Sequence, residues 1–287
     1  MILVVGATGG LGGKIAHCAL SAGNDVRILV REGSQYEELL ELGAQPAFGD
    51  LKDPSSLERA CQGIDAVVTT ANSAKRGGAD SIENVDLLGN ASLIDAAAAA
   101  GVQHFVFTSV LGANPQSPVA FISAKGKTED HLRASGMPYT ILEPNIFMDV
   151  WVNAIVDSPL RARQPVTLIG SGHKKHSFIV ERDVASFALG ALSNQGAKNK
   201  TIAIGGPRPL SWRDIVAVYE LFLGYPVVLQ ELPPGSALPG APQFMSDMLA
   251  FMDTYESPIN MTQTASDFKV ALTPVETFVR ESVARWN

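Results

Sequence analysis

The chain begins with MILVVGATGGLGG, residues 1–13, which joins a short apolar run to a glycine-rich turn. Met1 to Val5 is typical of a strand buried in a parallel sheet. The segment from Lys14 to Leu20 is amphipathic and predicts a helix directly after the turn. The first thirteen residues therefore predict a strand–turn–helix unit at the start of an α/β fold.

The glycines of this turn follow the spacing Gly-x-x-Gly-x-x-Gly, at positions 6, 9 and 12. A turn of this kind lets the backbone approach a pyrophosphate closely, and the first N–H groups of the following helix point at the ligand. A glycine-rich turn without a ligand is the alternative, but the position between strand and helix favours a dinucleotide site. The predicted contacts are Gly6, Thr8, Gly9, Gly10, Leu11 and Gly12.

Composition excludes several classes of function. Of the 287 residues, 46% are hydrophobic and 18% are charged, which indicates a folded core rather than broad disorder. The net charge of −7 argues against nucleic-acid binding, because phosphate backbones attract clustered Lys and Arg. With two cysteines and a first strand that starts at residue 1 or 2, we expect neither disulfides nor a signal peptide, and a cytoplasmic location. Apolar runs are too short to cross a bilayer.

Strands and helices alternate along the first half of the chain, which predicts a doubly wound, mostly parallel α/β sheet of the Rossmann type. The predicted strands are 1–5, 26–30, 45–48, 66–70, 105–108 and 139–142, and the predicted helices are 14–20, 36–42, 53–62, 84–100 and 121–135. Prolines and glycines become frequent after Asn145. We therefore divide the chain into a dinucleotide-binding domain, 1–144, and a smaller substrate-side region, 145–287, packed on the same sheet.

Several motifs occur in the order typical of one family. They are Gly6-Ala7-Thr8-Gly9, Leu29-Val30-Arg31-Glu32, Gly49-Asp50-Leu51, Phe107-Thr108-Ser109, Ser135-Gly136-Met137-Pro138-Tyr139-Thr140, Pro144-Asn145-Ile146-Phe147 and Phe178-Ile179-Val180-Glu181-Arg182-Asp183-Val184-Ala185. With these motifs the chain resembles the atypical short-chain dehydrogenase/reductases, and within them the NmrA-like branch. That branch includes NADPH:quinone reductases, triphenylmethane dye reductases, isoflavone-reductase-like enzymes and non-catalytic redox sensors. The resemblance covers nearly the whole chain, and it implies fold and cofactor better than substrate.

The second strand ends in Arg31, where NAD-binding relatives have an acid that binds the ribose 2′-hydroxyl. A guanidinium suits a 2′-phosphate, so we expect NADP(H), with Ser34 as a second donor. The alternative is a surface arginine balanced by Glu32. The resemblance further implies cofactor contacts at Asp50, Leu51, Thr70, Ala71, Asn72, Ser109, Lys125, Pro144, Asn145, Ile146 and Phe147. Asp50 and Asn72 are also suited to simple turns, and Ser109 to a buried cap.

Typical short-chain dehydrogenases carry Tyr-x-x-x-Lys on the helix after the fifth strand, where the tyrosine exchanges a proton with the substrate. This chain has Phe121 and Lys125 at those positions, so the lysine is present and the hydroxyl is absent. One interpretation is hydride transfer to a conjugated quinone-like or aromatic small molecule, with Lys125 as the catalytic residue. The other is a sensor or scaffold that binds NADP(H) without turnover. Lys125 as a solvent-facing helix residue is a further alternative.

Three features remain open on sequence grounds. Glu143 stands where many relatives have Arg, and it either repels anionic substrates or pairs with a base such as Lys125. His173 and His176 have no third metal ligand nearby, so we expect no metal and interpret both as loop residues. The Met- and Phe-rich segment 244–255 predicts a core helix, a homodimer helix or an adaptable lid over a flat substrate.

Overall fold

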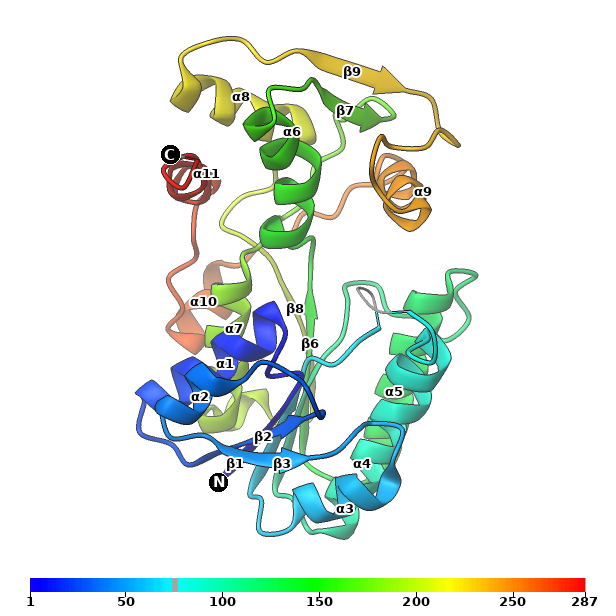
Figure 1. Ribbon diagram of the computed structural model, residues 1–287, viewed down its shortest axis with the longest axis vertical. Coiled ribbons are helices and arrows are strands. Elements are labelled where there is room, and N and C mark those ends of the chain that lie inside the picture. The colour runs from blue at the N-terminus through cyan, green and yellow to red at the C-terminus, as the bar shows by residue number, and fades with distance from the viewer. Residues whose placement is uncertain (74–76, 287) are drawn as a thin grey trace. The chain divides into compact units, whose positions relative to one another are not determined.

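The computed structural model describes residues 1–73 and 77–286, and the chain forms two compact units (Figure 1). The first unit contains Met1–Pro144, Glu181–Ala203 and Phe268–Val270. The second contains Asn145–Val180, Ile204–Asp267 and the chain from Ala271 on. Residues 181–203 and 268–270, which the sequence analysis assigned to the substrate-side region, belong to the first unit.

Within the described residues, seven strands form one sheet in the order β3-β2-β1-β4-β5-β6-β8. The neighbouring pairs from β3 to β6 are parallel, and the register sets Ile2 beside Val26 and Ala66. The strands are β1 (Ile2–Val5), β2 (Val26–Val30), β3 (Gln45–Phe48), β4 (Ala66–Thr69), β5 (His104–Thr108), β6 (Tyr139–Pro144) and β8 (Lys200–Ile204). This order is typical of the predicted Rossmann-type fold. Strands β2 and β3 are added on one side of β1, and β4, β5 and β6 on the other, so the strand order reverses between β1 and β4.

Helices cover both faces of this sheet (Figure 1). On one face lie α1 (Gly10–Ser21), α2 (Glu37–Glu41) and α7 (Glu181–Ser193); on the other lie α3 (Pro54–Cys61), the π-helix η1 (Ile82–Gly89), α4 (Asn90–Ala99) and α5 (Ala120–Ala134). Because both faces are covered, the central strands are apolar and fully buried, as in Val4, Val68 and Phe105.

Local signals set several helix boundaries. The side chain of Asp53 accepts a hydrogen bond from Ser55 N, and Pro54 follows as the first helical residue of α3, as predicted. The predicted helix 84–100 is divided between η1 and α4, where the side chain of Asn90 donates to Val85 O and Asp86 O. The Asn90 side chain thus gives two backbone carbonyls of η1 a hydrogen-bond donor.

The return of the chain to the first unit was not predicted. After the second unit begins, α7 packs against α1, β5 and β6, a short 3₁₀ turn η3 (Gln195–Ala197) follows, and β8 extends the sheet beyond β6. The residues of β8 are mostly half-exposed and lack a continuous apolar run. An edge strand of this kind carries little periodic signal in the sequence.

The second unit has its own core, which includes Val152, Phe178, Ile215 and Val279. Its elements are η2 (Met148–Asp157), α6 (Ser158–Arg161), β7 (Val166–Ile169), α8 (Trp212–Leu223), β9 (Leu229–Leu232), α9 (Gln243–Met252), α10 (Thr262–Phe268) and α11 (Val275–Val283). Strands β7 and β9 pair in parallel as a separate sheet. In the described part of the chain, no helix has both the length and the apolar character needed to cross a membrane.

Inside this core, Asp157 gathers donors from three elements. Its Oδ1 accepts hydrogen bonds from Tyr219 Oη at 2.9 Å, Ser282 Oγ at 2.6 Å and Trp286 Nε1 at 3.2 Å. Asp157 is 8% exposed, so these donors replace the water that the buried carboxylate has lost. The carboxylate therefore joins η2 to α8, to α11 and to the segment after α11.

Candidate nucleotide-binding site

The glycine turn after β1 brings two backbone segments too close for side chains. Gly6 directly follows β1 and has φ +91°, and from there the chain turns toward the start of α1. A Cβ on Gly12 would lie 2.1 Å from Gly6 O, so α1 can pack here only with glycine at this position. Gly9 N donates to Gly6 O at 2.9 Å and closes the turn.

The helix that follows starts without a side-chain cap. Gly9 is the N-cap of α1, and it forms no side-chain cap hydrogen bond. Thr8, Gly9 and Gly10 are exposed at this end. The first N–H groups of a helix and the positive end of its dipole attract an anion. The turn therefore fits the pyrophosphate of a dinucleotide.

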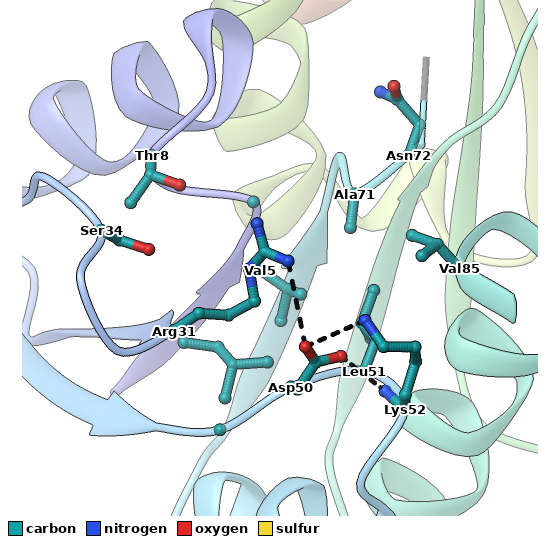
Figure 2. Close-up of a pocket in the computed structure, with 13 residues that line it drawn as sticks. Val5, Thr8, Arg31, Ser34, Asp50, Leu51, Lys52, Ala71, Asn72 and Val85 are labelled. Carbon is teal, nitrogen blue, oxygen red and sulfur yellow. Dashed lines mark hydrogen bonds and ion pairs between the residues drawn. The ribbon is translucent and has the colours of Figure 1, made fainter. Parts of the chain in front are cut away.

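A cleft lies beside this turn, at the carboxyl ends of β1, β2, β3 and β4 (Figure 2). It is lined by Val5, Gly6, Thr8, Leu29, Arg31, Ser34, Gly49, Asp50, Leu51, Lys52, Ala71, Asn72 and Val85. Eight of the predicted cofactor residues are in this set: Gly6, Thr8, Arg31, Ser34, Asp50, Leu51, Ala71 and Asn72. Positions up to 66 residues apart in the sequence, from Gly6 to Asn72, thus meet in one cleft.

Four charged side chains form a network at this cleft. Arg31 Nη1 lies 2.7 Å from Asp80 Oδ2 and 4.0 Å from Asp50 Oδ2. Lys52 Nζ lies 3.1 Å from Asp50 Oδ2 and also bonds to Asp80 Oδ1. The hydrogen bond to Asp80 is the main cause that raises the pKa of Lys52 above its ordinary value. Two cations and two carboxylates therefore balance at the end of β2, and Arg31 is paired with Asp80.

Sequence reasoning missed Lys52 and Asp80. Lys52 is two residues beyond Asp50, which forms the Asx turn considered above by accepting a hydrogen bond from Lys52 N at 2.9 Å. A basic residue directly after the Gly-Asp-Leu motif was thus an available signal. Asp80 comes from the loop before η1, and no local pattern connects it to Arg31, 49 residues earlier.

The remaining glycine-turn and β4 predictions lie around this cleft. Thr70 N donates to Val5 O at 3.0 Å, and Thr70 Oγ1 is the atom nearest to a Cβ built on Gly6, at 2.7 Å. Leu11 is 9% exposed and packs under the first turn of α1. Both residues therefore support the cradle, although neither lines the cleft.

Lys125 is buried, which excludes the solvent-facing alternative. Its side chain is 2% exposed, and Nζ donates to Thr108 O at 3.2 Å. Nζ also lies 4.8 Å from the ring centroid of Phe107 and 5.6 Å from that of Phe121. Burial lowers the pKa of Lys125, while the charges of Asp86 and Glu129 act in the opposite direction. The amino group of Lys125 is thus removed from water beside the end of β5.

Ser109, at the end of β5, is part of a buried polar cluster. Its hydroxyl donates to Glu129 Oε1, and Arg133 Nη2 donates to Glu129 Oε2 at 2.7 Å. Burial is the largest cause that raises the pKa of Glu143 to about 7, and the negative charge of Glu129 adds to this shift while Arg133 opposes it. Glu143 therefore faces Glu129 and Arg133, and the pairing with Lys125 that was considered from sequence does not occur.

The predicted turn Pro144-Asn145-Ile146-Phe147 is divided between the two units. Pro144 O accepts from Leu111 N within the first unit. In the second unit, Asn145 Nδ2 donates to Ser257 O at 2.8 Å, and Ile146 N donates to Asn145 Oδ1 at 2.9 Å. Ile146 O accepts from Ile179 N, and Phe147 O accepts from Trp151 N. The backbone groups of Ile146 are therefore already bonded within the second unit.

His176 is more than the loop residue expected from sequence. Its ring is fully buried, with Nδ1 2.7 Å from Ser257 Oγ and Nε2 3.1 Å from Met252 O. Across residues 1–73 and 77–286, no three or more His, Cys, Asp or Glu side chains form a group suited to a metal ion. The imidazole instead fixes the segment after α9 to the loop after β7.

Known proteins with this arrangement include reductases and assembly factors. The NAD(P)H azoreductase of Xenophilus azovorans is 31% identical over 87% of this chain and 85% of its own. The photosystem II assembly factor Ycf39 of Guillardia theta is 31% identical over 81% of this chain and 73% of its own. The NADPH complex of the quinone oxidoreductase QOR2 from Escherichia coli superimposes with a TM-score of 0.82, at 23% identity, over 98% of this chain and 99% of that chain.

The sequence profile of the NmrA-like family matches residues 1–279, which include the glycine turn, the charged cleft and the elements of the second unit. Together with the relatives above, this match shows that the chain belongs to the NmrA-like family.

Proposed function

We propose that this protein is an NADPH-dependent reductase that transfers hydride to a conjugated, quinone-like or aromatic acceptor. One observation carries the proposal: an uncapped helix start and a glycine turn adjoin a cleft that holds two cations, Arg31 and Lys52. The match to an NAD(P)H azoreductase and to a quinone oxidoreductase that binds NADPH supports the same activity. NADPH supplies the hydride when it is bound.

The two ends of the proposed cofactor have different partners. The first turn of α1, from Gly10, binds the pyrophosphate, and the backbone of Gly6 leaves space for it. Arg31 and Lys52 bind the 2′-phosphate, with Ser34 as a further donor, and Asp50 and Leu51 lie beside the adenine. An anion with two charges pairs with cations more strongly than a ribose hydroxyl does, so NADPH is preferred over NADH.

The nicotinamide end involves the residues that follow β4, β5 and β6. Ala71 and Asn72 lie along the nicotinamide ribose, and the Lys125 cation stabilises the negative charge that develops on the acceptor. The predicted contacts at Thr70, Ser109, Pro144, Asn145, Ile146 and Phe147 remain part of the proposal.

The acceptor class follows from the missing tyrosine and from aromatic side chains in the second unit. Phe121 exchanges no proton, so an acceptor that delocalises its charge is favoured over a simple ketone. The rings of Phe251 and Tyr255 are tilted by 50° with their centroids 5.0 Å apart, and the two residues are 40% and 36% exposed. Exposed paired rings suit a flat aromatic molecule. A homodimer contact through Phe251 and Phe244 is the competing use, and sedimentation of Phe251→Ala distinguishes the two.

The test measures NADPH oxidation at 340 nm against quinones, azo and triphenylmethane dyes, and enones. We expect turnover with at least one class, and Lys125→Met should lower kcat ~100-fold or more, the scale for one lost electrostatic stabiliser. Lys127→Met is the matched control, because Lys127 is an exposed lysine on the same helix. Equal losses in both variants would show that the charge of Lys125 has no special role.

The second candidate is an NADP(H)-binding sensor or scaffold without turnover, as the match to assembly factors suggests. NADPH binding with no oxidation above buffer across the panel would refute the reductase and favour this candidate. We place either activity in the cytoplasm, since Cys18 and Cys61 are both free thiols, as suits a reducing compartment.

A further inference from the structure

A buried amide joins two walls of the nucleotide cleft. Asn90 directly follows η1 and is 0% exposed. Its Nδ2 donates to Val85 O at 3.0 Å and to Ala71 O at 3.3 Å, and both of these residues line the cleft (Figure 2). Its Oδ1 accepts from Thr69 Oγ1 at 3.2 Å, and the same Thr69 oxygen accepts from Ala71 N at 3.3 Å. Together, Asn90 and Thr69 therefore bind both backbone groups of Ala71.

A buried carboxylate holds the same loop on the other side of Asn72. Ser73 N and Ser73 Oγ both donate to Asp86 Oδ2, at 3.0 Å and 2.6 Å. Asp86 is 0% exposed and Ser73 is 7% exposed, so water does not compete for these bonds and the charge of the carboxylate strengthens them. Asn72, which lines the cleft (Figure 2), thus lies between two neighbours whose backbones are fixed.

The residue that holds Ser73 is itself anchored to α5. The hydroxyl of Thr128 is shared between Asp86 O and Ala124 O, each 3.0 Å from Oγ1. Thr128 is 0% exposed, and Ala124 directly precedes Lys125 on α5. The loop after β4 is therefore linked through η1 to the helix that carries the proposed catalytic residue.

We propose that Asp86 and Asn90 are positioning residues for NADPH, which hold the loop after β4 against the nicotinamide ribose. This inference rests on the proposed function, in which Ala71 and Asn72 contact that ribose. A loop that is already fixed loses little conformational freedom when the cofactor binds, whereas a loose loop must be ordered and binds more weakly. Neither positioning residue lines the cleft, so each acts only through the loop.

Two ligands separate this role from a general effect on folding. NADPH contains the nicotinamide ribose, whereas adenosine 2′,5′-bisphosphate carries the adenine and the 2′-phosphate without it. Asp86→Ala removes the acceptor of both Ser73 bonds, and Asp86→Asn keeps an oxygen acceptor on a side chain of the same size. Glu83→Gln is the matched control, because Glu83 is an exposed acid on the same helix, η1. Calorimetric titration measures both ligands, and hydrogen exchange of the Ser73 amide in the cofactor-free protein measures how firmly the loop is held.

In Asp86→Ala, the exchange rate of the Ser73 amide and the Kd of NADPH should both rise ~10-fold or more, the scale for lost hydrogen bonds to a charged group. The Kd of adenosine 2′,5′-bisphosphate should stay within ~2-fold, because its binding is independent of this loop. Asp86→Asn should restore both quantities toward wild type, and Glu83→Gln should change neither. Ser73→Ala removes one of the two bonds and should raise the Kd of NADPH by only ~3-fold.

Equal weakening of both ligands by Asp86→Ala would refute the positioning role, as would an unchanged NADPH affinity. If circular dichroism shows that Asp86→Ala does not fold, Ser73→Ala decides, and an unchanged Kd for NADPH then refutes the role. If wild type does not bind NADPH, the proposed cofactor contact and the positioning role are refuted together. If wild type binds NADPH but reduces no acceptor, the reductase alone is refuted, because the positioning role is measured by binding.

Discussion

Arg31→Ala is the substitution that most directly examines how the cleft selects its nucleotide. Arg31 lies at the end of β2, where we propose that it binds the 2′-phosphate of NADPH. A charge-assisted hydrogen bond of this type contributes about 1.5–3 kcal/mol. NADH has no 2′-phosphate, so its affinity should not depend on this side chain. The substitution is therefore expected to weaken NADPH selectively.

The structure reduces the expected magnitude. Arg31 is already paired with Asp80 at 2.7 Å, and the phosphate must replace that carboxylate. The Arg31 side chain is 40% exposed, and an ion pair with this exposure contributes about 0.2–1 kcal/mol. The difference is about 1–2 kcal/mol, which corresponds to a ~5- to 30-fold increase in the Kd of NADPH.

Asp80→Asn checks the same reasoning with the opposite sign. It removes the carboxylate that competes with the phosphate for Arg31 and Lys52, and should tighten NADPH binding ~2- to 5-fold by the same pair energies. Calorimetric titrations with NADPH and NADH measure both variants. Arg59→Ala is the control, because Arg59 is an exposed arginine on α3. Equal weakening of both nucleotides by Arg31→Ala would refute the assignment, as would weaker NADPH binding in Asp80→Asn.

Three further predictions concern stability. Gly12→Ala should lower Tm and abolish nucleotide binding, because its Cβ would lie 2.1 Å from Gly6 O. Gly9→Ala should stay folded, because its Cβ would lie 3.3 Å from the same atom. Circular dichroism measures the folding of both variants, and titration measures their nucleotide binding. Burial lowers the pKa of His104 to about 4, so the free energy of unfolding should fall by about 3 kcal/mol as the pH is lowered from 6.5 to 4. In denaturant titrations, the free energy of unfolding of His104→Gln should depend less on pH over this range. Asp157→Ala, which leaves three donors unpaired, should cost about 2–4 kcal/mol in urea unfolding, and a loss below about 0.5 kcal/mol would contradict it.

The sign for His104 follows from its bonds. Thr140 Oγ1 donates its hydrogen to Ala197 O at 2.8 Å, so the bond of 2.9 Å between His104 Nε2 and Thr140 Oγ1 must have the imidazole as donor. Nδ1 is then the unprotonated nitrogen, and it is buried without a partner among the described residues. A second proton would create a buried charge there, which is why the folded state favours the neutral ring.

Local patterns predicted the elements of the first unit well. The bounds of β2 and β3 match the structure, because apolar runs between turn residues determine them, and Asp53-Pro54 marks the start of α3. The glycine turn and Arg31 could be identified for the same reason: each follows directly from an adjacent strand. Short-range patterns sufficed wherever strand, turn and helix are consecutive.

Long-range pairing was beyond such patterns. β8 joins the sheet 56 residues after the end of β6, and its half-exposed residues lack the periodicity of a buried strand. Asp80 reaches Arg31 from a different loop, and Ser109 after β5 donates a hydrogen bond to Glu129 on α5, 20 residues later. Electrostatic partners of this kind depend on tertiary packing, so a single sequence reveals the charged residue but not its neighbour.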